Sequence, residues 1–249
     1  MCGRYSLYES MDFYLRQLAL DKVVINGYDD ERINRYNVAP RSRVELIRPV
    51  QGGLSIDRVT WGWAPHWANG KGPVPINARG ETVLSGRFFK SLWPHGRVLA
   101  PANGWFEWVA DPAGGKGKQA YYIRAANDEP LFFAALAQVS NDPEQRKRDG
   151  FVILTGAADE GLLDVHDRKP LVLTPTLARE WLDPATPAHR AEMIVREGCR
   201  RATDFTWHPV GSAVGNVRNE GAALIQRVAL KGEPSQGQQT VNTPGRTSG

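Results

Sequence analysis

Alternating and continuous apolar segments dominate the chain and predict a protein made mainly of short β-strands. Strands are expected within CGRYSL at the start and at residues 44–47, 54–63, 97–99, 105–109, 120–124, 131–137 and 151–155. Helical spacing of apolar residues predicts helices at 10–20, 176–182 and 187–200. Gly and Pro interrupt residues 71–75, so residues 76–79 are expected to form a shaped loop.

No repeat or linker divides the chain before its end. From residue 231 onward, Gly, Gln, Ser, Thr and Pro leave almost nothing to bury in a core, which predicts a disordered tail over 229–249. We therefore expect one α+β domain over residues 1–228. Its β-rich core should be mostly antiparallel and barrel-like, with short flanking helices.

The composition restricts the possible classes of protein but does not by itself indicate a function. Of 249 residues, 41% are hydrophobic, which is enough for a substantial core. The net charge of +4 permits a nucleic-acid partner through a local basic groove without requiring one. The sequence shows no apolar run long enough to span a bilayer and no secretory signal, and its two cysteines do not suggest a disulfide framework. These features favour the cytoplasm, with association to the nucleoid.

The position of Cys2 suggests a specific chemistry. After removal of Met1, an N-terminal cysteine offers a thiol and a free α-amine two carbons apart. The amine can form a Schiff base with an aldehyde, and the thiol can then close a five-membered thiazolidine ring. Reference pKa values of about 7.7–8.0 for the amine and about 8.5 for the thiol leave part of each nucleophilic near neutral pH. The alternative is that Cys2 is an incidental small residue.

Three further residues could handle protons or orient a substrate. Asn77 lies in PINARGE, two residues before Arg79. Glu107 is surrounded by the aromatic residues of GWFEW, which would raise its pKa if it is buried. Alternation along a strand also allows Glu107 to face solvent. His166 follows the strand predicted at 151–155, and a lone histidine is often structural.

Eight tryptophans are heavy usage for this length, and WGWAPHW places three of them together. Exposed aromatic rings interleaved with basic residues can stack on unpaired bases, although core positions are equally expected for many of them. Candidates for phosphate contact are Arg4, Arg79, Arg87, Lys90 and Arg97. The histidines lack metal-binding spacing, and we expect neither a metal nor a cofactor.

Eight segments in order resemble the SOS response-associated peptidase family, whose members process abasic sites in bacteria and eukaryotes. They are MCGR at the start, YNVAP (36–40), WGWAP (61–65), INAR (76–79), NGWFEW (103–108), ILTGAA (153–158), HDRKP (166–170) and VGNVRNEG (214–221). The resemblance runs to about residue 225. It implies a β-rich fold with a positively charged DNA-binding groove and the N-terminal cysteine at its floor.

The resemblance also implies an activity, in which the protein crosslinks abasic sites in single-stranded DNA through a thiazolidine. Cys2 would be the nucleophile, Asn77 would orient the amine or the opened sugar, and Glu107 would relay protons. His166 would act as acid or base on the deoxyribose ring oxygen. The implied DNA contacts are Arg4, Pro40, Trp61, Trp63, Arg79 and Arg87.

One residue departs from the family pattern, which usually has Met where this chain has Lys169. Single-stranded DNA containing abasic sites is the expected partner of a monomeric protein that acts beside the replication machinery. Two other functions fit parts of the sequence. An N-terminal-nucleophile amidotransferase would use Cys2, with Asn103 and Gly104 as an oxyanion hole. A plain single-strand-binding module would use the tryptophans and arginines and leave Cys2 idle.

Overall fold

The computed structural model describes residues 2–19, 24–27, 30–68, 72–110, 117–159, 162 and 167–230. The helices are α1 (Met11–Leu18), α2 (Pro175–Leu182) and α3 (Ala188–Glu197). The strands are β1 (Tyr5–Leu7), β2 (Val24–Asn26), β3 (Arg35–Val38), β4 (Arg43–Val50), β5 (Gly53–Thr60), β6 (Asn77–Arg79), β7 (Arg97–Ala102), β8 (Gly104–Ala110), β9 (Lys118–Ala125), β10 (Leu131–Gln138), β11 (Gly150–Ala157), β12 (Arg168–Pro170), β13 (Val172–Leu173) and β14 (Phe205–Val210).

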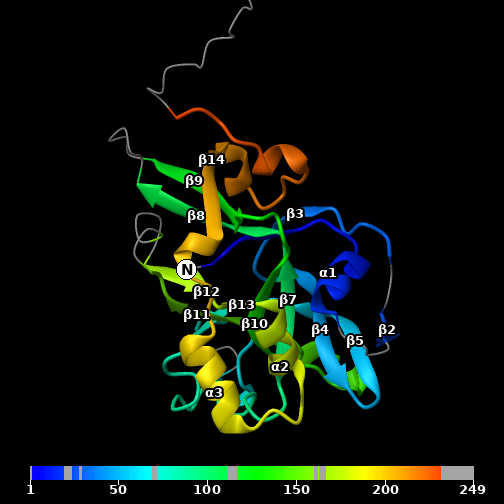
Figure 1. Ribbon diagram of the computed structural model, residues 1–249. Helices are drawn as coiled ribbons and strands as arrows, with labels where there is room; N and C mark the ends of the chain where they lie inside the picture. The colour runs from blue at the N-terminus through cyan, green and yellow to red at the C-terminus, as the bar shows by residue number, and fades with distance from the viewer. Residues whose placement is uncertain are drawn as a thin grey trace, which may run out of the picture.

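The strands form two sheets (Figure 1). The first has the order β14-β9-β8-β1-β3, and the second has the order β12-β11-β10-β7-β4-β5-β2, with β13 beside β10 and β6 beside β11. Two pairings, β6 with β11 and β2 with β5, are parallel, and the other described pairings of named strands are antiparallel. The predicted α+β class with a mostly antiparallel core is therefore confirmed. Among the described strands the two sheets stay open, so the barrel-like core does not close.

Aromatic residues join the two sheets in a common core. Tyr5 of β1 makes edge contacts with Trp61 and with Phe133 of β10, at centroid distances of 5.2 and 5.8 Å. Trp105 of β8 contacts the same Phe133 at 6.3 Å. All four side chains are fully buried. Large rings at the interface bury much apolar area, which fixes the first sheet against the second.

Side-chain caps and apolar faces define the helices. The hydroxyl of Ser10 accepts a hydrogen bond from the backbone N–H of Phe13, and Thr174 caps α2 in the same way through the N–H of Leu177. α2 packs against β7 and β10, with α1 and α3 beside it (Figure 1). The helices predicted at 10–20, 176–182 and 187–200 are thus confirmed with small shifts at their ends.

Residues 76–79 differ from the predicted loop. Asn77–Arg79 is a three-residue strand, because it pairs in parallel with β11, with Asn77 opposite Ile153. A pairing with a distant strand leaves no local signal in so short a segment. The tail predicted from residue 229 falls mostly on residues 231–249, which lie outside the described residues.

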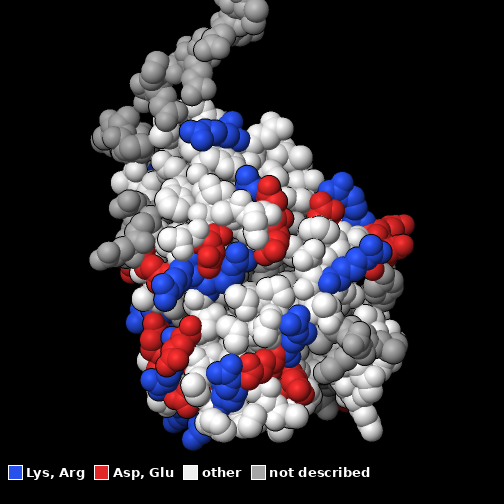
Figure 2. Space-filling model, in the orientation of Figure 1, with Lys and Arg blue, Asp and Glu red and all other residues white. Residues whose placement is uncertain are grey.

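Charge is mixed over the face drawn in Figure 2, where Lys and Arg side chains lie among Asp and Glu side chains. This mixture agrees with the low net charge of +4. On this face, an anionic partner would meet local basic clusters rather than one broad positive field. Within the described part of the chain, no helix is long and apolar enough to cross a membrane.

Candidate functional site at the seam of the two sheets

Cys2 is buried three residues before the start of β1, at the junction of the two sheets. Asn77, the first residue of β6, belongs to the other sheet, and its Nδ2 donates a hydrogen bond to the carbonyl oxygen of Cys2 over 2.9 Å. The Oδ1 atom of Asn77 is buried and has no hydrogen-bond partner among the described residues. Asn77 thus holds the backbone of Cys2, and its Oδ1 atom can still accept a hydrogen bond from a ligand.

The pleat of β8 turns Glu107 towards the same junction. β8 pairs with β1, Tyr5 lies opposite Trp105, and the N–H of Phe106 donates to the carbonyl of Arg4. Trp105 faces the core between the sheets, and Glu107, two residues on, shares that face. Glu107 is 3% exposed. The alternative in which this carboxylate faces solvent is therefore wrong.

Burial changes the protonation behaviour of both groups. It raises the pKa of Glu107 to about 7. Burial also raises the pKa of the Cys2 thiol, and the nearby charge of Glu107 raises it further. At neutral pH the thiol is protonated, while Glu107 is divided between its acid and its base form.

Arg4 is held inside the protein rather than extended to solvent. Its Nη1 donates to Asn37 Oδ1 at 2.8 Å and to the carbonyl of Val214 at 2.7 Å, and its guanidinium lies 5.7 Å from the ring centre of Trp108. Asn37 Nδ2 in turn donates to the carbonyls of Asn216 and Asn219. The segments YNVAP and VGNVRNEG therefore meet at Arg4, a contact that their separation in sequence concealed.

The segment HDRKP is tied to the Asn77 strand through Arg168. Its guanidinium donates to both carboxylate oxygens of Glu81, at 2.7 and 3.0 Å, and to the carbonyl of Thr155. His166 lies outside the described residues, so its predicted role stays a prediction. Its neighbour Asp167 is described, and the charge of Asp167 contributes to the raised pKa of Glu107.

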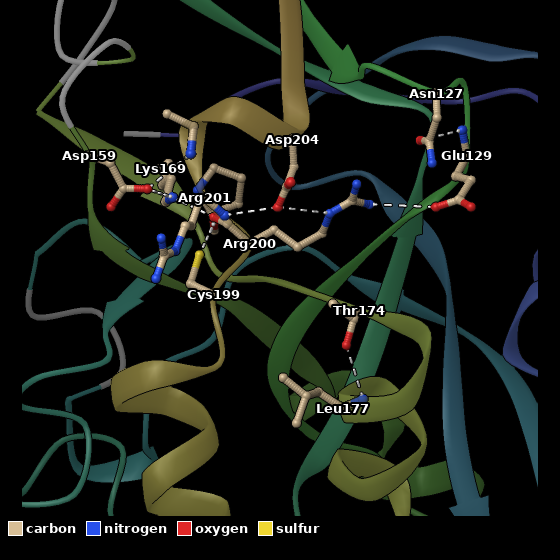
Figure 3. Close-up of polar contacts among 12 residues, drawn as sticks. Asn127, Glu129, Asp159, Lys169, Thr174, Leu177, Cys199, Arg200, Arg201 and Asp204 are labelled. Carbon is tan, nitrogen blue, oxygen red and sulfur yellow. Dashed lines mark hydrogen bonds and ion pairs between the residues drawn. The ribbon is translucent and has the colours of Figure 1, made fainter.

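Lys169, the departure from the family pattern, is 1% exposed. Its Nζ donates to Asp159 Oδ2 at 2.7 Å and to the carbonyl of Arg200 at 2.6 Å (Figure 3). Partial burial alone would raise the pKa of Asp159, but the hydrogen bond and charge of Lys169 lower it. Lys169 thus joins β12 to the chain after α3, and its hydrogen bonds and burial give it a structural role.

The predicted DNA-contacting residues differ in accessibility. Arg79 and Arg87 are exposed and Pro40 is half-buried, whereas Trp61 and Trp63 are 0% and 4% exposed. Trp67, in the same aromatic segment, is 49% exposed, and the guanidinium of Arg87 lies 4.6 Å from its ring centre. Trp61 therefore presents no ring face to solvent, so a stacking surface here would have to use exposed neighbours such as Trp67.

Asn103 has a structural use that sequence reasoning missed. Its Oδ1 accepts hydrogen bonds from the N–H of Tyr8 and from the hydroxyl of Tyr14 in α1. A Cβ on Gly104 would lie 2.5 Å from the carbonyl of Ile123, so glycine is needed for close packing. This pair therefore has packing and hydrogen-bonding roles independent of an oxyanion hole. Within the described ranges, no group of three or more His, Cys, Asp or Glu side chains could hold a metal ion.

Comparison with known proteins agrees with these features. Residues 1–217 match the family model of the SOS response associated peptidase. The abasic site processing protein YedK of Escherichia coli is 46% identical over 92% of this chain and all of its own length, and YoqW of Bacillus subtilis is 29% identical over 91% and 99%. A phage-related protein of Bordetella bronchiseptica has a similar structure, with a TM-score of 0.71 and 38% identity over 85% of this chain and 95% of its own. The chain therefore belongs to the SOS response-associated peptidase family.

Proposed function

We propose that this protein recognises abasic sites in single-stranded DNA and bonds to them covalently through Cys2 after Met1 is removed. The observation that carries the proposal is the meeting of Cys2, Asn77 and Glu107 at one buried junction, where the Asn77 amide holds the Cys2 carbonyl at 2.9 Å. The names of the relatives, abasic site processing proteins, identify a substrate whose opened sugar carries an aldehyde.

The reaction needs no cofactor. The α-amine of Cys2 adds to the aldehyde carbon and loses one water to give a Schiff base. The thiol then adds to the same carbon, and a base carries the thiol proton to the nitrogen, which becomes a secondary amine within a thiazolidine ring. Because the raised pKa keeps the thiol neutral, the amine attacks first and the sulfur closes the ring afterwards.

Glu107 is suited to the proton transfers in this sequence. A carboxyl group with a pKa of about 7 is present in both forms near neutrality, so it can remove a proton and return it. The buried Oδ1 of Asn77 can accept a hydrogen bond from the Cys2 amine or from a hydroxyl of the opened sugar. His166 is proposed as the acid or base that opens the sugar ring.

The strand flanking the lesion would cross the exposed residues near this junction. Arg79 follows Asn77 by two positions on β6 and is exposed, which suits it to a phosphate. Arg87 and Trp67 form an exposed pair of cation and ring on which an unpaired base can stack. Pro40 would form another part of the surface on which bases stack. Arg4 is buried, so it would support the DNA-binding surface from below through its hydrogen bonds to Asn37 and Val214.

Denaturing electrophoresis after incubation with an abasic single-stranded oligonucleotide tests the assignment of the nucleophile. Wild-type protein should give a heat-stable adduct, and Cys2→Ala should give none. Cys2→Ser should give at most a labile adduct, because a hydroxyl closes the ring poorly. Cys199→Ala, which removes the other cysteine, is the matched control and should react as wild type does. A heat-stable adduct with Cys2→Ala would refute the proposal.

A further inference from the structure

A cavity of about 530 Å³ lies beside the buried Trp61 and Trp63 of the WGWAPHW segment. Basic side chains from three separate parts of the chain line it, namely Arg41, His66, Lys147 and Arg148, and Trp61 and Trp63 contribute to its wall. Arg41 follows β3, His66 belongs to the tryptophan segment, and Lys147 and Arg148 end the short 3₁₀ helix Pro143–Arg148. The convergence of distant segments makes this cavity a built feature of the fold.

The positive charge in the cavity has little compensation. Among the described residues, Arg41, Lys147 and Arg148 make no ion pair, and all three are exposed. Asp149 is the acidic residue of the lining, and its carboxylate accepts a hydrogen bond from the N–H of Ser140 at 2.8 Å. Three cations against one carboxylate favour an anionic ligand.

The backbone at Arg41 is in the left-handed region, with φ of 68°. Such a conformation is unfavourable for a residue with a long side chain, and glycine would adopt it without strain. The turn itself is fixed by the backbone, because the N–H of Arg41 donates to the carbonyl of Trp61 at 2.8 Å. Arginine here therefore contributes its charge to the cavity at the expense of local stability.

The wall of the cavity is fixed in place by β11 and β10. The N–H of Gly62 donates to the carbonyl of Phe151 at 2.8 Å, and the indole of Trp63 donates to Gln138 Oε1 at 3.2 Å. A Cβ on Gly150 would lie 2.3 Å from the carbonyl of Gly62, so the two chains are in close contact. A ligand would meet a site that is already formed, which reduces the entropy lost on binding.

The cavity is connected to the Cys2 junction through one side chain. Trp61 is one of the residues that line the cavity, and its buried indole donates to the carbonyl of Ile76 at 2.9 Å. The next residue, Asn77, holds the carbonyl of Cys2. The wall of the cavity and the support of Cys2 therefore lie on the same short stretch of chain, Ile76–Asn77, joined through the buried Trp61.

We propose that this cavity is a second nucleic-acid subsite, in which Arg41, Lys147 and Arg148 hold backbone phosphates of the strand beyond the lesion. The inference rests on the proposed function and extends the DNA footprint past the junction of Cys2, Asn77 and Glu107. A volume of about 530 Å³ is larger than one phosphate group needs, and the apolar side chain of Val74, which lines the cavity and is 40% exposed, can contact the sugars between phosphates.

Binding of undamaged single strands of about 20 nucleotides, followed by fluorescence anisotropy across a salt titration, tests the subsite. Arg41→Gly and the double change Lys147→Gln with Arg148→Gln should weaken binding by about threefold or more per charge removed, and each lost phosphate contact should reduce the salt slope by about 0.7. Arg146→Gln removes a charge from the same helix without changing the cavity lining and should bind as wild type does.

Arg41→Gly has a second readout that separates binding from folding. Because glycine accepts the positive φ, its melting temperature should equal or exceed that of wild type while its affinity falls. Unchanged affinity and salt slope in Arg41→Gly would overturn the proposal. Inorganic phosphate that binds saturably through Arg41, with no loss of DNA affinity in the variant, would assign the cavity to a free anion and also overturn it.

A short abasic oligonucleotide of about five nucleotides keeps this test separate from the proposed function. It presents the aldehyde to Cys2 but carries few backbone phosphates for the cavity to hold, so wild type and Arg41→Gly should crosslink it almost equally. If wild type crosslinks the short strand and Arg41→Gly matches wild type on the long one, the subsite alone is refuted. If wild type crosslinks neither strand, the proposed function fails as well.

Discussion

The thiol of Cys2 lies in surroundings that suppress its ionisation. Reactive cysteines usually have a lowered pKa, produced by a neighbouring cation or a helix terminus. Here burial and the charge of Glu107 both raise the pKa of the thiol. A neutral thiol resists oxidation and indiscriminate alkylation. It becomes useful once an amine has formed the Schiff base and placed an electrophilic carbon beside it.

The raised pKa of Glu107 should be visible in the pH dependence of folding. The folded protein holds this proton more tightly than the unfolded chain, so the stability associated with Glu107 falls as pH rises from about 4.5 to about 7. Glu107→Gln lacks the titration, so its stability relative to wild type should increase over the same window, by about 3 kcal/mol at most.

Urea unfolding at about pH 5 and about pH 8 measures this difference. The comparison uses wild type and Glu107→Gln at each pH, so titrations shared by both proteins cancel. A difference in unfolding free energy that does not change with pH would show that Glu107 titrates normally in the folded protein.

At the scale of elements, Arg4 connects β1 to β3 and to the 3₁₀ helix Ser212–Gly215. Its hydrogen bonds to Asn37 and Val214 are buried, so Arg4→Ala should lower the free energy of unfolding by about 3 kcal/mol. Arg16→Ala on α1 is the control: that side chain is 78% exposed and pairs with Asp12, so its loss should cost less than about 1 kcal/mol. Equal free energies of unfolding for the two variants in urea would show that Arg4 does not stabilise the fold.

The longer elements could be predicted from sequence because each carries its own pattern. The strand expected at 131–137 became Leu131–Gln138, and the one at 151–155 became Gly150–Ala157. Asn77–Arg79 was missed because its three residues become a strand only beside β11. β14 (Phe205–Val210) was missed too, although it pairs along its length with β9.

The site was predicted in part, for a similar reason. The motifs pointed to Cys2, Asn77 and Glu107, and the fold brings these three together. They did not reveal that Trp61 is buried, because tryptophan occurs both in cores and on binding surfaces and the sequence motif does not distinguish the two. Nor did they reveal that Arg4 binds Asn37, since that contact depends on how the first sheet meets the segment after β14.

At the scale of the whole molecule, the mixed surface charge gives a clear expectation about nucleic-acid choice. Local basic clusters and an exposed ring at Trp67 suit a strand with unpaired bases, whereas a duplex keeps its bases stacked. Single strands should bind more tightly than blunt duplex, and binding should weaken steeply with salt. Equal affinity for both forms throughout a salt titration would contradict a stacking surface.

Intact mass spectrometry after incubation with an abasic single-stranded oligonucleotide tests the covalent chemistry most directly. Protein that has lost Met1 should gain the mass of the oligonucleotide minus one water, the balance required by thiazolidine formation. A variant with a bulky residue between Met1 and Cys2 keeps the thiol but has no free amine on Cys2, so it should gain no stable mass. A processed protein whose mass stays unchanged, or an equally stable adduct in the blocked variant, would contradict the account.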